Sequence, residues 1–111
     1  MFALKFRLTG ALLTGDLGTM HCIGAFVITP ENEALGGSAT CTYVDGGSDS
    51  YDLSGSVEGI RSGNAWTGSW HATTVSGFEM EFSGAGEIDG SQLTGTFTFV
   101  DDDYSVTVEL K

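Results

Sequence analysis

Apolar and polar residues alternate with a period of two along most of the chain. Turn-forming residues interrupt this alternation at intervals of about eight to twelve residues, which is typical of an all-β sandwich or barrel. No stretch of useful length has the 3.6-residue period of an amphipathic helix. The pattern predicts strands at residues 2–9, 11–17, 19–29, 35–44, 50–59, 65–74, 77–88, 92–100 and 103–110.

The segments between the predicted strands are short and polar. They read PENEA, DGGSDS, RSGN, IDGS and DDD, and they contain the residues that turns favour. Short connections favour antiparallel pairing between neighbouring strands, and no linker or shift in composition divides the chain. We therefore predict one domain over residues 1–111, a small antiparallel up-and-down (meander) β-barrel of eight or nine strands. A two-sheet β-sandwich is the alternative.

Glycine supports the barrel. The chain has 17 glycines in 111 residues, about twice the usual share of 7%, and many follow an apolar residue and a Ser or Thr. In the strand 92–100, Leu93, Gly95 and Phe97 share one face. The same alternation places Phe78 and Phe82 on the inward face of 77–88. Inward glycines occur where a strand bends sharply or where a large neighbour needs room, as in a closed sheet.

Aromatic residues also fall on the predicted inward faces. A barrel of about eight strands has an interior that side chains fill, or that holds one small ligand. We favour a filled core, with a narrow apolar cavity as the alternative. If a cavity exists, the candidate ligand-binding residues are Tyr43, Trp66, Trp70 and Phe97.

Three stretches of the chain resemble the strands of avidin-type barrels. They are LGTMHCIGAFVITPENEALGGSA, SYDLSGSV and AWTGSWHATTVSG. Similar phrasing occurs in lipocalin-like barrels. The resemblance implies an eight-stranded antiparallel barrel with a small ligand at its open end. The chain departs from the avidin pattern at residues 13–16, where Leu-Thr-Gly-Asp replaces the Trp and Asn before the family's L-G-[ST] motif. No biotin-binding residue is therefore carried over.

Charge narrows the choice of partners. The chain has 15 acidic and 4 basic residues, for a net charge of −11. Such a surface repels nucleic acids and anionic membranes, and it suits a protein with a basic surface. A role in solubility or a salty habitat would explain the same charge. The candidate partner-binding residues are Asp45, Asp49, Asp52, Glu79, Glu81, Asp101, Asp102 and Asp103.

Residues for catalysis or metal binding form no recognisable motif. His71 is expected to point outward, opposite the face of Trp66 and Trp70, and His21 has no evident partner. The acidic clusters match no calcium loop, and the Cys and His residues lack the spacing of metal ligands. We predict no catalytic residue, no metal and no cofactor.

The two cysteines, Cys22 and Cys41, flank a predicted hairpin. They would face each other if its turn centres near Glu31 and Asn32. The N-terminal stretch alternates and lacks the apolar core of a signal peptide, so we expect a cytoplasmic protein. Because disulfides are rare in that compartment, two buried free thiols are favoured over a disulfide.

These observations favour a non-enzymatic binding protein that acts through its acidic surface. One example is an inhibitor or decoy that occupies the groove of a basic, nucleic-acid-binding protein. The first alternative is a barrel of the avidin or lipocalin type that binds a small apolar ligand. The second alternative is an enzyme with its site in the barrel mouth.

Overall fold

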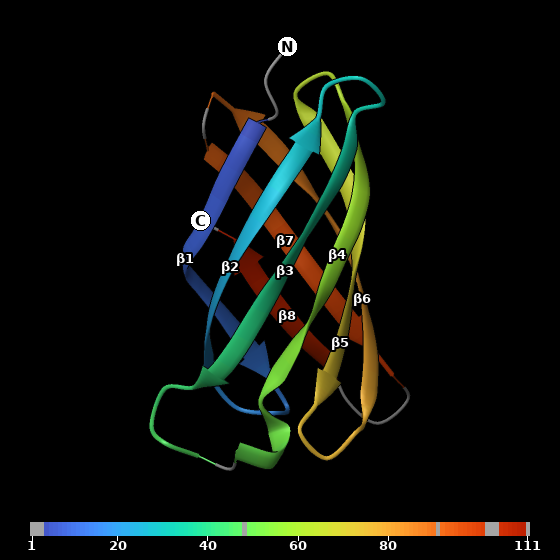
Figure 1. The fold of residues 1–111 in the computed structure, drawn as a ribbon. Helices are drawn as coiled ribbons and strands as arrows, with labels where there is room; N and C mark the ends of the chain where they lie inside the picture. The colour runs from blue at the N-terminus through green and yellow to red at the C-terminus, as the bar shows by residue number, and fades with distance from the viewer. Residues whose placement is uncertain (1–3, 48, 91, 102–104, 111) are drawn as a thin grey trace.

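The fold is a closed barrel of eight antiparallel strands in sequence order (Figure 1). The computed structural model describes residues 4–47, 49–90, 92–101 and 105–110, without the side chain of Asp49. Each strand pairs with its neighbours in the sequence, and β1 closes the barrel on β8. The strands are β1 (Leu4–Gly15), β2 (Met20–Thr29), β3 (Ala34–Tyr43), β4 (Leu53–Ser62), β5 (Ala65–Thr74), β6 (Glu79–Asp89), β7 (Gln92–Val100) and β8 (Ser105–Leu110). The prediction of an up-and-down barrel is confirmed, and the sandwich is not formed.

The prediction of two strands within residues 2–17 is wrong, because β1 runs through Gly10. Leu8 pairs with Gly24 and Ala11 pairs with Cys22, so one extra residue of β1 forms a β-bulge. The buried positions change from even to odd numbers across this bulge, from Leu8 to Ala11. In the sequence, this shift of the apolar positions from even to odd numbers looks like a break between two strands. In the structure, the bulge lets one continuous strand keep its apolar side chains inside the barrel.

Other strand ends shift by a few residues. β4 begins at Leu53, because Asp49–Tyr51 form a short 3₁₀ helix, η1. β6 begins at Glu79, and Phe78 lies before it with 48% of its surface exposed. The prediction that Phe78 faces inward is therefore wrong, since the strand pattern does not extend to it. The bounds of β5 and β7 agree with the prediction.

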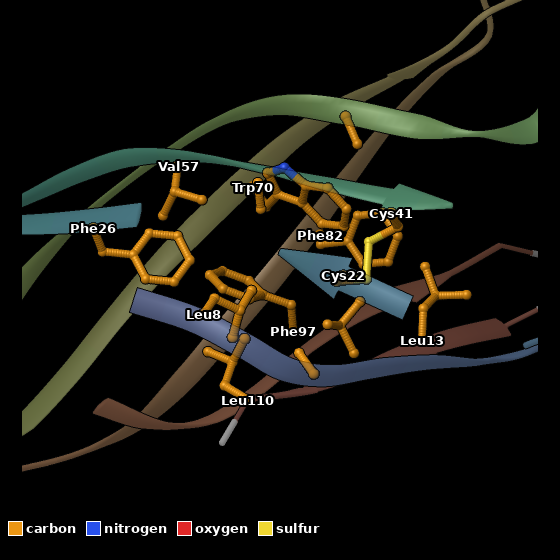
Figure 2. Close-up of a cluster of buried hydrophobic side chains, with 14 of the residues drawn as sticks. Leu8, Leu13, Cys22, Phe26, Cys41, Val57, Trp70, Phe82, Phe97 and Leu110 are labelled. Carbon is orange, nitrogen blue, oxygen red and sulfur yellow. A yellow bond between two sulfur atoms is a disulfide. The ribbon is translucent and has the colours of Figure 1, made fainter. Parts of the chain in front are cut away.

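Side chains fill the barrel interior (Figure 2). Trp66 contacts Phe97 with ring centroids 5.3 Å apart, and Trp70 contacts Phe82 at 4.8 Å. Both tryptophans are 1% exposed. The space left in the middle of this cluster is about 10 Å³, roughly the least that one water molecule requires. The interior described here is a packed core.

Glycines make room for these rings. Gly86 pairs with Gly95 across β6 and β7, and the indole of Trp66 lies against both. A Cβ at Gly86 would come within 2.7 Å of Trp66 Nε1, and one at Gly95 within 2.8 Å of Trp66 Cζ2. Gly95 also has a φ of +150°, which side chains disfavour. The nearest atoms to such a Cβ are backbone carbonyl oxygens of the paired strand, Thr94 O for Gly86 and Ala85 O for Gly95. These two positions therefore allow both the partner strand and the Trp66 ring to come close.

Each buried indole has a hydrogen-bond partner. Trp66 Nε1 donates to the carbonyl oxygen of Thr94 at 2.9 Å, and Trp70 Nε1 donates to that of Gly55 at 3.2 Å. An unsatisfied indole N–H in the core would cost about 1–3 kcal/mol. The two bonds therefore fix the rings in place as well as satisfying them.

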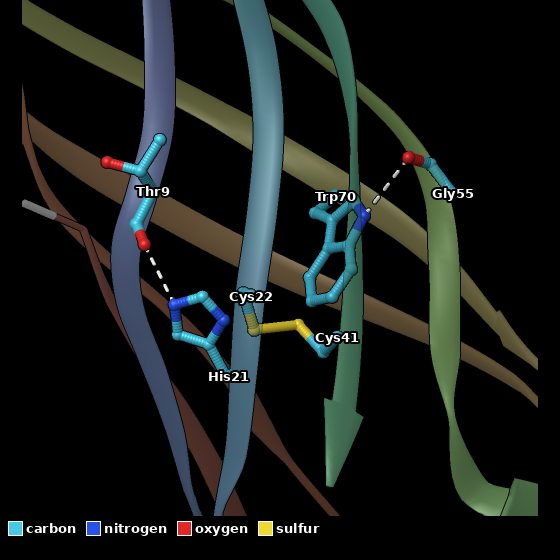
Figure 3. The surroundings of a disulfide bond; sticks show 6 residues. All are labelled: Thr9, His21, Cys22, Cys41, Gly55 and Trp70. Carbon is cyan, nitrogen blue, oxygen red and sulfur yellow. Dashed lines mark hydrogen bonds between the residues drawn. A yellow bond between two sulfur atoms is a disulfide. The ribbon is translucent and has the colours of Figure 1, made fainter. Parts of the chain in front are cut away.

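Cys22 and Cys41 form a disulfide between β2 and β3 (Figure 3). They are directly opposite in the strand register, as the predicted hairpin requires. The expectation of two free thiols is wrong, because this register brings the two side chains together on the same inward face. On the outer face, His21 Nε2 lies 2.8 Å from the carbonyl oxygen of Thr9, in the bulge of β1.

No helix in the described part of the chain has the length and apolar character needed to cross a membrane.

Candidate functional site

The candidate site is an open pocket of about 570 Å³ at one end of the barrel, the lower end in Figure 1. The β1–β2, β3–β4, β5–β6 and β7–β8 connections reach this end, and they are described over residues 16–19, 44–47, 49–52, 75–78 and 101. We call this the loop end. The pocket volume falls within the range of about 300–1,000 Å³ usual for ligand sites. Its lining residues are Asp16, Leu17, Tyr43, Tyr51, Thr74, Ser76, Phe78 and Met80.

Tyr43 is the last residue of β3, and its ring is enclosed by two glycines. A Cβ at Gly18 would lie 3.5 Å from Tyr43 Cε1, and one at Gly47 would lie 2.9 Å from Tyr43 Cγ. Burial raises the pKa of the Tyr43 phenol above its ordinary value of 10.0, and charges on Tyr51 and Asp52 raise it further. The phenol is therefore neutral at physiological pH.

The turn between β5 and β6 forms one wall of the pocket. Phe78 N donates to Thr74 Oγ1 at 3.0 Å, and Thr74 N donates to Phe78 O at 2.9 Å. Thr74 Oγ1 also lies 3.0 Å from Ser76 Oγ, which donates to the carbonyl oxygen of Ser50 at 3.4 Å. The hydroxyl groups thus hold this turn in shape and connect it to η1.

Two carboxylates lie near the pocket. Asp16 Oδ2 accepts a hydrogen bond from Ser105 N at 3.0 Å, which ties the β1–β2 turn to β8. Asp52 precedes β4, and its charge acts on the Tyr43 phenol. Asp52 Oδ1 is buried and has no hydrogen-bond partner among the described residues. A donor brought to this atom would satisfy an acceptor that is otherwise unfavourable to bury.

Large apolar side chains are exposed around the same end. Val44, Tyr51, Val75, Phe78 and Val100 expose between 48% and 74% of their surface. Each lies in or beside one of the four connections of the loop end. Exposed apolar groups are common singly, but a group gathered in one place indicates an interaction surface.

Charge at this end has one sign. Among the described side chains of the four connections, Asp16, Asp45, Asp52 and Asp101 are acidic, and none is Lys, Arg or His. Lys5, Arg7 and Arg61 lie outside these connections, on β1 and β4. Arg61 Nη2 is 3.6 Å from Glu33 Oε1 near the opposite end. The loop end therefore combines negative charge with exposed aromatic surface.

The predicted ligand-binding residues divide into two groups. Trp66, Trp70 and Phe97 lie in the packed core, where they are 1–2% exposed. Tyr43 lies at the loop end and lines the open pocket. The structure does not bring these four residues together around one space.

The predicted partner-binding residues also divide. Asp45 and Asp101 are exposed at the loop end, and Asp52 is half-buried there. Glu79 and Glu81 are exposed on the outer face of β6. The side chain of Asp49 and all of Asp102 and Asp103 lie outside the described residues. The sequence prediction did not include Leu17, Tyr51 or Phe78 among the binding residues, although an aromatic residue inside the acidic stretch DGGSDSYD was a signal for Tyr51.

His71 is exposed on β5, as predicted, and its Nε2 is 3.2 Å from Glu58 Oε1. Glu81 on β6 lies opposite His71 in the strand register. A shallow depression of about 320 Å³ lies beside these two residues. Among the described residues, no group of three His, Cys, Asp or Glu side chains could hold a metal ion.

No family model matches the chain. Searches of the curated proteins and of the solved structures also found no match. We therefore infer function from the geometry and charge of this chain.

Proposed function

We propose that this protein is a non-enzymatic binding protein that attaches to a basic protein surface through its loop end. Inhibition of a basic, nucleic-acid-binding protein is one activity that such binding would produce. The observation that carries the proposal is the coincidence of several carboxylates with exposed Tyr51, Phe78 and Val75 at the loop end.

Each part of this face has a separate effect on binding. Opposite potentials steer two proteins together and determine their relative orientation. Aromatic and aliphatic side chains then provide the contact area that gives an interface most of its affinity. A surface that served only for solubility would gain nothing from exposing Val75 at 73% and Val100 at 74% beside its carboxylates.

The interior offers little support for a small apolar ligand. Trp66, Trp70 and Phe97 are packed against neighbouring strands, and about 10 Å³ remains among the core side chains. A small ligand would therefore have to bind in the pocket at the loop end. An enzyme in the barrel mouth is the weaker alternative, since the titratable groups that line the described pocket are Asp16, Tyr43 and Tyr51.

The first test uses two variants with the same change in net charge. One replaces Asp45, Asp52 and Asp101 by Asn at the loop end. The other replaces Glu31 and Glu87 by Gln and Asp89 by Asn, all exposed residues at or near the opposite end. Wild type and both variants are used as bait in a low-salt pull-down from the source cells, with mass spectrometry of the captured proteins.

We expect wild type and the opposite-end variant to retain the same basic protein, and the loop-end variant to lose it. Binding of the purified partner should weaken steeply as salt rises from about 0.1 M to 1 M, where the screening length falls from about 10 Å to 3 Å. Equal retention by all three baits, or binding that is unchanged at 1 M salt, would contradict the proposal.

The disulfide bears on the compartment in which this binding occurs. Disulfides are rare in the reducing cytosol and common in oxidising compartments. The pairing of Cys22 with Cys41 therefore favours an oxidising location over the cytoplasmic one that the sequence suggested. Alkylation of free thiols in freshly lysed source cells, followed by mass spectrometry, distinguishes the two.

A further inference from the structure

The pocket at the loop end has the chemistry of a receptor for one kind of side chain. Its wall is aromatic, with Tyr43, Tyr51 and Phe78 in the lining, and Asp16 also lines it. We infer that this pocket binds an arginine side chain of the basic partner, together with part of the segment that carries it. The inference rests on the proposed function and names the group that the loop end recognises.

Aromatic rings and carboxylates favour a cation that can lose its water. A guanidinium stacks on the face of a Phe or Tyr ring, and cation–π attraction adds to this contact. It is also more weakly hydrated than the ammonium group of lysine. The exposed rings of Tyr51 and Phe78, at 49% and 48%, offer such faces. Arginine therefore gains more from this wall than lysine does.

The carboxylates supply acceptors for the five N–H donors of a guanidinium. Asp16 lies in the pocket wall. Asp52 Oδ1 is buried without a partner among the described residues, close enough to Tyr43 to affect its phenol. Asp16 therefore supplies the acceptor in the pocket wall, and Asp52, which is not among the lining residues, adds negative charge near Tyr43.

The pocket is also formed before the partner arrives. Hydrogen bonds from Phe78 N and Ser76 Oγ fasten the β5–β6 turn to β5 and to η1. Gly18 and Gly47 leave space beside the ring of Tyr43, which a Cβ at Gly47 would take up. A preformed wall reduces the ordering that binding would otherwise require. A single arginine can therefore contribute measurably to affinity.

The test compares two synthetic peptides that have the same length, charge and flanking residues and differ only in carrying arginine or lysine. Their binding to the full-length protein is measured by isothermal titration calorimetry at low salt. We expect the arginine peptide to bind about three- to tenfold more tightly, a difference in line with one or two cation–π contacts. This comparison on wild type requires no variant to fold.

Three variants locate the preference. Phe78→Ala and Tyr51→Ala remove exposed rings from the pocket, and both should bring the arginine peptide to the affinity of the lysine peptide. Ile60→Ala is the matched control, because Ile60 is 55% exposed on β4, outside the pocket. It should leave the preference unchanged. Thermal unfolding of each variant establishes that it is folded.

The outcomes separate this inference from the proposed function. Equal affinity for the two peptides, or a preference that survives Phe78→Ala and Tyr51→Ala, would overturn the arginine site. In that case, if the loop end binds basic partners, the variant with Asp45, Asp52 and Asp101 replaced would still bind both peptides more weakly than wild type does. If that variant bound both peptides as well as wild type does, the proposed function would be lost as well.

Discussion

The barrel contains two groups of aromatic residues whose environments are opposite. In the core, Trp66 and Trp70 are 1% exposed, each with its N–H bonded to a strand carbonyl. At the loop end, Tyr51 and Phe78 are about half exposed beside carboxylates. The first group is enclosed by strands that glycine allows to come close. The second lies outside the strands, with Tyr51 in η1 and Phe78 in the β5–β6 turn.

This difference shows that aromatic content alone does not identify a ligand site in a small barrel. A ring that lies over Gly86 and Gly95 is surrounded by backbone, and its surface is used by the fold. A ring held by a turn such as Thr74–Phe78 leaves its face to solvent, and therefore to a partner. The two groups should respond differently to the same kind of substitution.

The largest expected effect separates the two groups directly. Trp70→Ala should reduce the free energy of unfolding by about 3–5 kcal/mol, because it leaves a cavity in the core. Phe78→Ala should change it by less than about 1 kcal/mol, as is usual for exposed positions. Urea denaturation measures both. Similar losses in the two variants would show that the loop end is part of the core.

The disulfide joins β2 to β3 within the core, where both cysteines are buried. A variant with both Cys22 and Cys41 replaced by Ala should lose about 3 kcal/mol of stability, the value expected for closing a loop of similar length. Thermal or urea unfolding, compared with wild type treated with a reductant, gives this number. If the reductant leaves the stability of wild type unchanged, the result would argue against the disulfide.

The glycines under the indole provide a smaller effect. Gly95→Ala should cost about 1–3 kcal/mol, because the new methyl group would press on Trp66 and on the β6 backbone. Gly36→Ala is the control, as a Cβ there meets no atom within 4 Å. Its stability should stay within about 0.5 kcal/mol of wild type. Equal effects would mean that space beside Trp66 is not what Gly95 provides.

The smallest effect concerns the pH dependence of stability at the loop end. The pKa of Tyr43 is raised in the folded state, so the folded protein holds the phenol proton more tightly than the unfolded chain does. This contribution is fully present below the ordinary pKa and is lost as pH rises through the folded-state pKa. In the Tyr43→Phe variant, the free energy of unfolding should therefore decrease less steeply as pH rises above about 10. Urea titrations at pH 8–11 compare the two slopes; matching slopes would contradict the shift.

Much of the fold could be predicted from local alternation. The bounds of β5 and β7 follow from it, because apolar and polar residues alternate there without interruption. It failed at the bulge of β1, where an extra residue reverses the phase at Gly10. It also failed at Phe78, which continues the alternation of β6 in the sequence but lies in the turn before that strand begins. Alternation reports which face a residue would take, and not where the strand ends.

The candidate site was less accessible to prediction. Asp45, Asp52 and Asp101 were identified from charge alone. Tyr43 was identified as an aromatic residue, but it was grouped with core residues. The pocket brings together residues from three connections that are far apart in the sequence, with Tyr43, Thr74 and Met80 from the adjoining strands. Only the closing of the barrel places residues 16–19 beside 75–78.

The sequence by itself determined that this chain forms an all-β fold of neighbouring antiparallel strands with glycines on their inward faces, and it favoured a barrel over a sandwich. Period-two alternation and short turns leave few other arrangements for strands of this length. The tertiary structure alone decided which aromatic rings are enclosed, that Cys22 meets Cys41, and that one end gathers carboxylates around exposed rings. These outcomes depend on strand register and barrel closure, which are set by contacts between residues distant in the chain.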